Sequence, residues 1–148
     1  MTERPRIVDY GFVCPVTTRW MDNDVYGHVN NVTFYSYFDT AANRFLIERG
    51  GLDIHAGAVI GLVVESHCAY HAPIAFPQEL RAAVRVDKLG TRSVTYGIAI
   101  FTATDDTAVA HGYFVHVFVD RATRTAVPIP AELRAELETI RVSSPYRA

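Results

Sequence analysis

The chain has 148 residues, of which 49% are hydrophobic and 20% are charged, a balance typical of a folded globular protein. This length predicts one domain, 1–148. The formal net charge of −2, without a run of basic residues, gives no electrostatic reason to expect nucleic acid or an anionic membrane surface as a partner. Residues 1–6 lead into polar and aromatic residues rather than a long apolar stretch, so we expect no secretory signal, no membrane span and a cytoplasmic location.

The first half of the chain predicts a strand followed by a long helix. β-Branched residues fill Phe12–Trp20, and apolar residues at helical spacing follow Asn31 as far as Arg49. Gly50 and Gly51 come next and admit the left-handed conformation that ends helices. We therefore expect the helix to span Asn31 to Arg49.

The second half predicts four more strands and a short helix. Prolines and turn residues separate the strand candidates, which are 59–71, 79–89, 93–104 and 108–120. The last three are joined tightly enough to form an antiparallel meander, and the long helix must cover one face of the sheet. An amphipathic helix is expected over 128–137 after a proline start, and residues from about 142 to 148 are expected to form a loose tail. The class is α+β, although spacing alone does not distinguish among helix-on-sheet folds.

A polar segment lies between the first strand and the long helix. It contains two carboxylates, a histidine and two asparagines, namely Asp22, Asp24, His28, Asn30 and Asn31. Either asparagine is a natural helix N-cap. A carboxylate beside a helix N-terminus keeps its negative charge favourably, and free N–H groups there can polarise an acyl oxygen that becomes an oxyanion. This junction is therefore the candidate site of chemistry.

The segment Asp22–Asn31, with the aromatic run Phe34–Phe38, resembles the signature of the 4-hydroxybenzoyl-CoA thioesterase family of hot-dog-fold proteins. The likeness continues through 70–80 and 89–94. It implies a hot-dog fold, in which a five-stranded antiparallel sheet wraps a long central helix. It also implies that Asp24, three residues before Gly27, is the catalytic acid. By the same count, Asn31 supplies the backbone N–H that contacts the thioester carbonyl.

His28 departs from this pattern, because many bacterial relatives have an aliphatic residue there. The His-Val-Asn-Asn segment at 28–31 is instead similar to plant acyl-carrier-protein thioesterases, in which that histidine is implicated in catalysis. Two readings of His28 stay open, a catalytic partner of Asp24 and a hydrogen-bonding support of the pocket wall. Asp22 is interpreted as a structural residue. Tyr26, together with Gly27 and Asn30, is expected to contact substrate.

The resemblance implies two further groups of binding residues. It places Glu65, Ser66 and His67 on a strand beside the substrate pocket, as acyl-pocket or subunit-interface residues, whereas a polar edge face is the structural alternative. Arg92 and Ser93 resemble the position where relatives bind the phosphates of coenzyme A, which suits the bidentate fork of arginine. An exposed arginine in a turn is the alternative reading there.

Metal and disulfide chemistry are not expected. His67 and His71 share one face of a strand without a third ligand, and His111 and His116 face opposite ways. The two cysteines, Cys14 and Cys68, are too few for a disulfide scaffold, and each falls in an apolar segment. We expect no metal or redox cofactor, because thiolate is a competent leaving group.

The expected function is hydrolysis of an acyl-CoA or related acyl thioester to a carboxylic acid and a thiol, with Asp24 as nucleophile or general base. An acyl-carrier-protein thioesterase that uses Asp24 and His28 is one alternative, and a non-catalytic acyl-binding protein is another. A hot-dog hydratase is disfavoured, since it has four residues between its aspartate and histidine, whereas Asp24 and His28 have three between them. The resemblance also implies a homodimer or homotetramer with active sites at the subunit interface.

Overall fold

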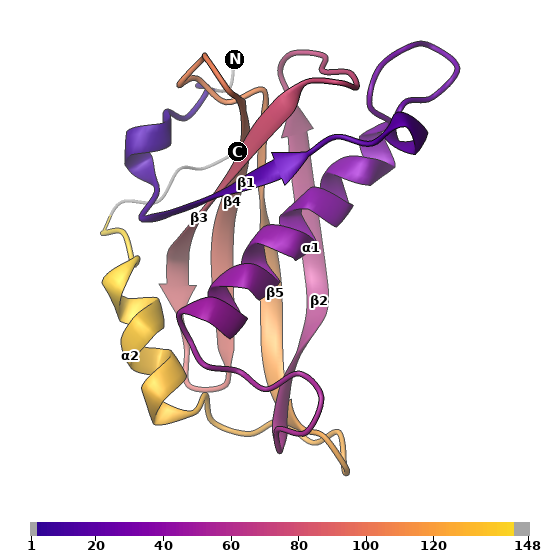
Figure 1. The fold of residues 1–148 in the computed structure, drawn as a ribbon. Helices are drawn as coiled ribbons and strands as arrows, with labels where there is room; N and C mark the ends of the chain where they lie inside the picture. Colours follow the sequence, from indigo (N-terminus) through magenta and orange to yellow (C-terminus); the bar gives the residue numbers. More distant parts are fainter. Residues whose placement is uncertain (1–2, 144–148) are drawn as a thin grey trace.

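The computed structural model describes residues 3–143 of the chain. A five-stranded antiparallel sheet, in the order β1-β3-β4-β5-β2, packs against α1 (Figure 1). The strands are β1 (Phe12–Thr17), β2 (Val59–Tyr70), β3 (Glu79–Leu89), β4 (Ser93–Thr102) and β5 (Ala110–Asp120). The helices are α1 (Asn31–Glu48) and α2 (Ala131–Thr139), with the short 3-10 helices η1 (Ile7–Asp9) and η2 (Trp20–Asp22). This is the hot-dog fold, so the predicted fold class is confirmed.

Most element bounds agree with the sequence, and the differences have local causes. The first strand ends at Thr17 rather than Trp20, because the Thr18 hydroxyl bonds the carbonyl oxygen of Gln78 and the chain then turns into η2. The second helix begins at Ala131, with Pro130 in an extended conformation as its N-cap. The loose tail was expected from about residue 142, but the Val142 N–H donates to the Val86 carbonyl oxygen at 3.0 Å. Residues 144–148 of that expected tail lie outside the described part of the chain.

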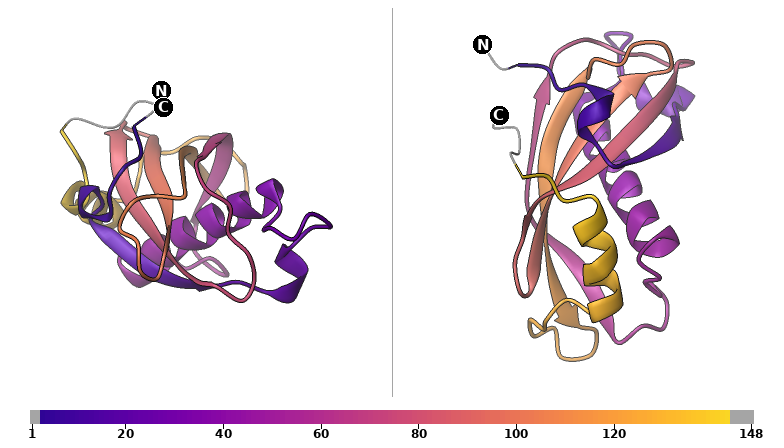
Figure 2. Two further views of the ribbon diagram at one scale, coloured as in Figure 1. Left: turned by 90° about the horizontal axis from the view of Figure 1, so that it is seen from above. Right: turned by 90° about the vertical axis from the view of Figure 1, so that its left-hand side faces the viewer.

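The main core lies between α1 and one face of the sheet. The buried face of α1 carries large aromatic residues together with Ala41 and Ala42, whose small side chains let the helix approach the strands closely. Figures 1 and 2 show α1 crossing the sheet diagonally. It begins beside the end of β2, where the Tyr70 hydroxyl bonds the Asn31 carbonyl oxygen, and ends beside α2, where Arg49 pairs with Glu136. The first half of β2 is thus farther from the helix than its end.

The opposite face of β3 and β4 is covered by the segment that precedes β1. Tyr10 packs edge-on against Phe101, with 6.0 Å between the ring centroids, and Ala83 and Ala99 complete this smaller core. Among residues 3–143, no helix combines the length and the hydropathy needed to cross a membrane.

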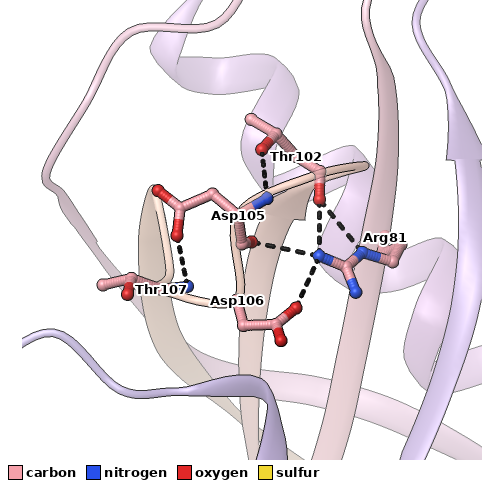
Figure 3. A network of polar contacts seen from close by, with 5 residues as sticks. All are labelled: Arg81, Thr102, Asp105, Asp106 and Thr107. Atoms are coloured by element: carbon pink, nitrogen blue, oxygen red, sulfur yellow. Dashed lines mark hydrogen bonds and ion pairs between the residues drawn. The ribbon is translucent and has the colours of Figure 1, made fainter.

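Arg81 organises the loop between β4 and β5 (Figure 3). Its Nη2 donates to the carbonyl oxygens of Thr102 (2.8 Å) and Asp105 (3.0 Å), and to the carboxylate of Asp106 (3.1 Å). Beyond this loop, the Val109 carbonyl oxygen accepts hydrogen bonds from the backbone N–H groups of residues 71 (2.8 Å) and 72 (3.1 Å). The ordered loop therefore helps to position the chain that follows β2.

Candidate active site

Asp24 lies in a tight turn between η2 and α1. Its backbone N–H donates to the His28 carbonyl oxygen (2.9 Å), and the Gly27 N–H donates to the Asp24 carbonyl oxygen (3.1 Å). Gly27 has a φ of +83°, which residues with a side chain rarely adopt, so the turn favours glycine here. The Oδ1 atom of Asp24 accepts the Tyr26 N–H at 2.9 Å. The other carboxylate oxygen bonds no group among residues 3–143, which leaves it available to water or substrate.

Asp22 is buried and connects this turn to α1. Its carboxylate accepts the Tyr37 hydroxyl (2.7 Å), the Arg19 backbone N–H (2.9 Å) and the Arg19 guanidinium (3.0 Å). Its carbonyl oxygen accepts the Asn30 N–H at 2.9 Å. Burial acts to raise the pKa of Asp22, but the hydrogen bonds from Tyr37 and Arg19 outweigh it and lower the pKa below its usual value. Both carboxylate oxygens are thus engaged within the protein.

The N-terminus of α1 lies directly after the turn. Asn30 is the N-cap, and its side-chain oxygen accepts the Val32 N–H at 3.0 Å. The Asn31 N–H, at the first helical position, donates to no group in residues 3–143. It is therefore a free donor at the positive end of the helix dipole.

A cleft of about 460 Å³ lies between the turn and the segment that follows β2. Asp24, His28 and Asn31 contribute polar groups to it. The Val29 N–H donates to the Ile74 carbonyl oxygen at 2.8 Å and ties the two walls together. Aromatic and aliphatic residues line much of the rest, including Tyr26, Val29, Phe34, Tyr70, Pro73 and Ile74. The cleft therefore combines a carboxylate, a free helix N–H and an apolar surface.

Two of the other expected binding residues lie close to this cleft. Gly27 and Asn30 line a neighbouring hollow of about 770 Å³, which also includes Asp24 and Tyr26. The turn therefore separates two concave surfaces that share Asp24.

Glu65, Ser66 and His67 lie in the middle of β2, outside the cleft of the same chain. Ser66 pairs with the core residue Phe114 and so faces the α1 side of the sheet. The other two side chains face the opposite side, where the Tyr113 hydroxyl donates to Glu65 (2.5 Å) and the Tyr113 ring stacks on His67. The structure of one chain therefore does not bring these three residues together with Asp24.

Arg92 and Ser93 lie at the turn between β3 and β4, at the end of the sheet opposite Asp24 (Figure 1). Their carbonyl oxygens accept the backbone N–H groups of Phe118 (2.9 Å) and Gly90 (2.8 Å), which fixes the turn. The Arg92 residue is exposed. Neither residue lines the Asp24 cleft of the same chain.

Residues 16–137 match the family model of the thioesterase-like superfamily. The chain belongs to this superfamily. The match spans the last two residues of β1, all of α1, the strands β2 to β5 and most of α2, and it contains every candidate site residue described above. Superfamily membership supports hydrolysis of a thioester.

Solved structures similar to this superfamily member include the PA5185 protein from Pseudomonas aeruginosa strain PAO1. That protein is 54% identical, with a TM-score of 0.93, and the match covers 96% of this chain and 99% of that one. The 1,4-dihydroxy-2-naphthoyl-CoA thioesterase Slr0204 from Synechocystis is 18% identical, with a TM-score of 0.76 and coverage of 85% and 94%. The BH1999 gentisyl-coenzyme A thioesterase is 22% identical, with a TM-score of 0.76 and coverage of 85% and 99%. The last two show a shared fold. A comparison with curated proteins finds no match.

One polar pair of this thioesterase-superfamily chain was not expected from its sequence. The ring nitrogens His71 Nε2 and His111 Nδ1 lie 2.7 Å apart, and His71 is one of the cleft residues. Burial, with the positive field of His71 and Arg85, lowers the pKa of His111 to about 4. The strand register that joins the two histidines is a long-range property, so spacing along the chain gives no signal for it. Among residues 3–143, no three His, Cys, Asp or Glu side chains gather as a metal site would require.

Proposed function

We propose that the protein is an acyl-CoA thioesterase similar to the 4-hydroxybenzoyl-CoA thioesterases. The observation that supports this most is the shared cleft, in which a carboxylate oxygen of Asp24 and the N–H of Asn31 both lack a partner within residues 3–143. Thioester hydrolysis needs a nucleophile or base next to a donor for the carbonyl oxygen. Both groups come from one short segment, whose shape is held by the hydrogen bonds around Asp22.

In the general-base route, Asp24 removes a proton from water, and the water oxygen bonds to the thioester carbonyl carbon. In the nucleophilic route, the Asp24 carboxylate itself bonds to that carbon and gives a mixed anhydride, which water then hydrolyses. In both routes the carbon–sulfur bond breaks, and the thiolate leaves and takes up a proton. The Asn31 N–H and the α1 dipole stabilise the oxyanion, and one such donor contributes about 3 kcal/mol.

An acyl-carrier-protein thioesterase is the second candidate, because His28 lines the same cleft as Asp24. In that case His28 is a catalytic partner rather than a support of the wall. The formal net charge of −2 and the absence of a basic run favour CoA, since a carrier protein is usually acidic and would gain little attraction.

We further propose that a second copy completes the site. β2 is an edge strand, and its side chains Leu62, Val63 and Val64 are 37%, 45% and 60% exposed. Such an apolar edge invites pairing with another strand. Beside Asp24, the side chains of Trp20 and Val25 are also exposed, by 76% and 96%. One partner that pairs along β2 covers both surfaces.

Antiparallel pairing of two β2 strands also accounts for the distant candidate residues. It sets the Tyr70 end of one strand beside the Val59 end of the other, and places Glu65–His67 near the middle of the pair. The turn with Arg92 lies at the Val59 end of the sheet. It therefore moves toward the cleft of the other copy, where a guanidinium suits the phosphates of CoA.

The test is release of free thiol from a panel of acyl-CoA esters, assayed beside acyl-carrier-protein and short thiol esters. We expect CoA esters to be hydrolysed fastest. Hydrolysis of no thioester would overturn the proposal, and a preference for the carrier-protein ester would favour the second candidate. Sedimentation of the same sample decides between a dimer, a tetramer and a monomer, and an active monomer would contradict the shared site.

A further inference from the structure

Hydrogen bonds hold both of the peptide groups that flank Asn31. In the group before it, the Asn30 carbonyl oxygen accepts the Thr33 N–H at 2.9 Å. In the group after it, the Val32 N–H donates to the Asn30 side chain at 3.0 Å. The carbonyl oxygen of that same group belongs to Asn31, and it accepts the Tyr70 hydroxyl at 2.9 Å. Because a peptide group is planar, bonds at its two ends fix its orientation, and Tyr70 therefore helps to set the conformation of Asn31.

Tyr70 provides the bond of this set that comes from outside the helix and its cap. The first turn of a helix lacks part of its internal hydrogen bonds and frays easily. Tyr70 is the last residue of β2, and its backbone pairs with Ala110 of β5. Its ring packs edge-on against Phe34 of α1, with 5.2 Å between the centroids and 87° between the planes. The hydroxyl thus reaches the Asn31 carbonyl oxygen from a fixed position and ties the start of α1 to the sheet.

The Tyr70 side chain also lines the cleft that contains Asp24 and Asn31. A tyrosine hydroxyl has one proton to donate, and this one is donated to the Asn31 carbonyl oxygen. Partial burial raises the pKa of Tyr70, so the hydroxyl stays protonated and does not act as a base near pH 7. The geometry therefore favours an indirect role for Tyr70, through the start of α1, over direct contact with the reacting atoms.

We propose that Tyr70 is a positioning residue for thioester hydrolysis, whose hydroxyl holds the start of α1 so that the Asn31 N–H stays directed at the thioester oxygen. The proposal rests on the proposed thioesterase function. A donor stabilises an oxyanion best when its direction is fixed before the reaction. The oxyanion develops only as the carbonyl carbon is attacked, so a loosened Asn31 N–H should slow the chemical step more than it weakens substrate binding.

The test is Tyr70→Phe, which keeps the ring against Phe34 and removes only the hydroxyl. On the best acyl-CoA ester we expect kcat to fall about tenfold, less than the loss of about a hundredfold or more when such a donor is removed outright, with KM within about twofold. Tyr35→Phe is the matched control. Tyr35 also lies on α1 and stacks on Phe114, and its hydroxyl donates no hydrogen bond within residues 3–143. Both constants should therefore stay within about twofold, and thermal melting verifies that the two variants are folded.

A two-dimensional ¹H–¹⁵N NMR spectrum of the ligand-free protein tests the same contact without substrate. Tyr70→Phe should shift the backbone signals of Asn31 and Val32 and leave that of Asn43, farther along α1, in place. An unchanged Asn31 signal, or an unchanged kcat in a protein that hydrolyses the ester, would overturn the role of Tyr70.

The pattern of the two kinetic constants separates this role from a direct contact with substrate. A raised KM with an unchanged kcat in Tyr70→Phe would overturn the positioning role, because that pattern marks an interaction made equally with bound substrate and transition state. If the unsubstituted protein hydrolyses no thioester, the proposed function is wrong and the positioning role falls with it, even where the Asn31 signal shifts.

Discussion

The hydrogen bond from Tyr37 to Asp22 should make a large contribution to the stability of the site. Both residues are buried, at 4% and 2% exposed, and the oxygen atoms lie 2.7 Å apart. A hydrogen bond to a charged group contributes about 1.5–3 kcal/mol. We therefore expect Tyr37→Phe to lower the free energy of unfolding by about 2 kcal/mol and Tm by roughly 4–8 °C.

Arg19→Ala is the matched control, because its guanidinium bonds the same carboxylate from a side chain that is 61% exposed. An ion pair open to water contributes less than about 1 kcal/mol. Urea unfolding at pH 7 gives both values. A loss below about 0.5 kcal/mol for Tyr37→Phe, or a larger loss for Arg19→Ala, would refute the reasoning.

The pH dependence of stability provides a second check on the hydrogen bond between Tyr37 and Asp22. The pKa of Asp22 is lowered in the folded state, so its contribution is present above the unfolded pKa of about 3.8 and is lost as the pH falls through the folded value. The difference in stability between Tyr37→Phe and the unsubstituted protein should therefore shrink below about pH 3.8. A difference that stays constant to lower pH would mean that the hydrogen bond does not favour the ionised carboxylate.

Three further outcomes are expected. Burial is the main cause that lowers the pKa of His111 and of His116 to about 4, so between pH 4 and 6.5 both are neutral in the folded protein but protonated in the unfolded one. The free energy of unfolding should therefore fall as the pH drops from 6.5 to 4, by roughly 2–3 kcal/mol for each histidine. A Tm that stays constant over this pH range would argue against this. Arg92→Ala should raise KM for CoA esters several-fold with little change in kcat, and equal losses for esters without the nucleotide would exclude a phosphate contact. Val64→Lys should reduce sedimenting mass and activity together, and an active monomer would contradict the shared site.

The sequence predicted the helix and the polar turn well because their signals are local. The cap at Asn30 and the glycines after α1 mark the helix, and the distance from Asp24 to Asn31 is set by one short segment. The strand bounds were less accurate, because side-chain bonds such as Thr18 to Gln78 end β1 early. Local signals thus predict the wall of the cleft that the turn and the start of α1 form.

Long-range pairing determines the rest, and spacing alone could not predict it. The second wall of the cleft is held by the Val109 carbonyl oxygen, and His71 meets His111 only through the register of β2 and β5. The wrapping of the sheet around α1 was expected from family resemblance rather than from periodicity. Arg92 lies at the end of the sheet far from Asp24, so its expected contact with CoA depends on the proposed second copy.

The most direct test of the central claim is the turnover of Asp24→Asn on the best acyl-CoA ester, measured beside Asp22→Asn. The substitution keeps the size of the side chain and its hydrogen bond with Tyr26 but removes the charge, so the fold should survive, as circular dichroism can verify. We expect kcat to fall at least about a hundredfold for Asp24→Asn and less for Asp22→Asn. Unchanged turnover in a folded Asp24→Asn protein, or a larger loss of turnover for Asp22→Asn, would contradict the assignment of Asp24 as the reacting carboxylate.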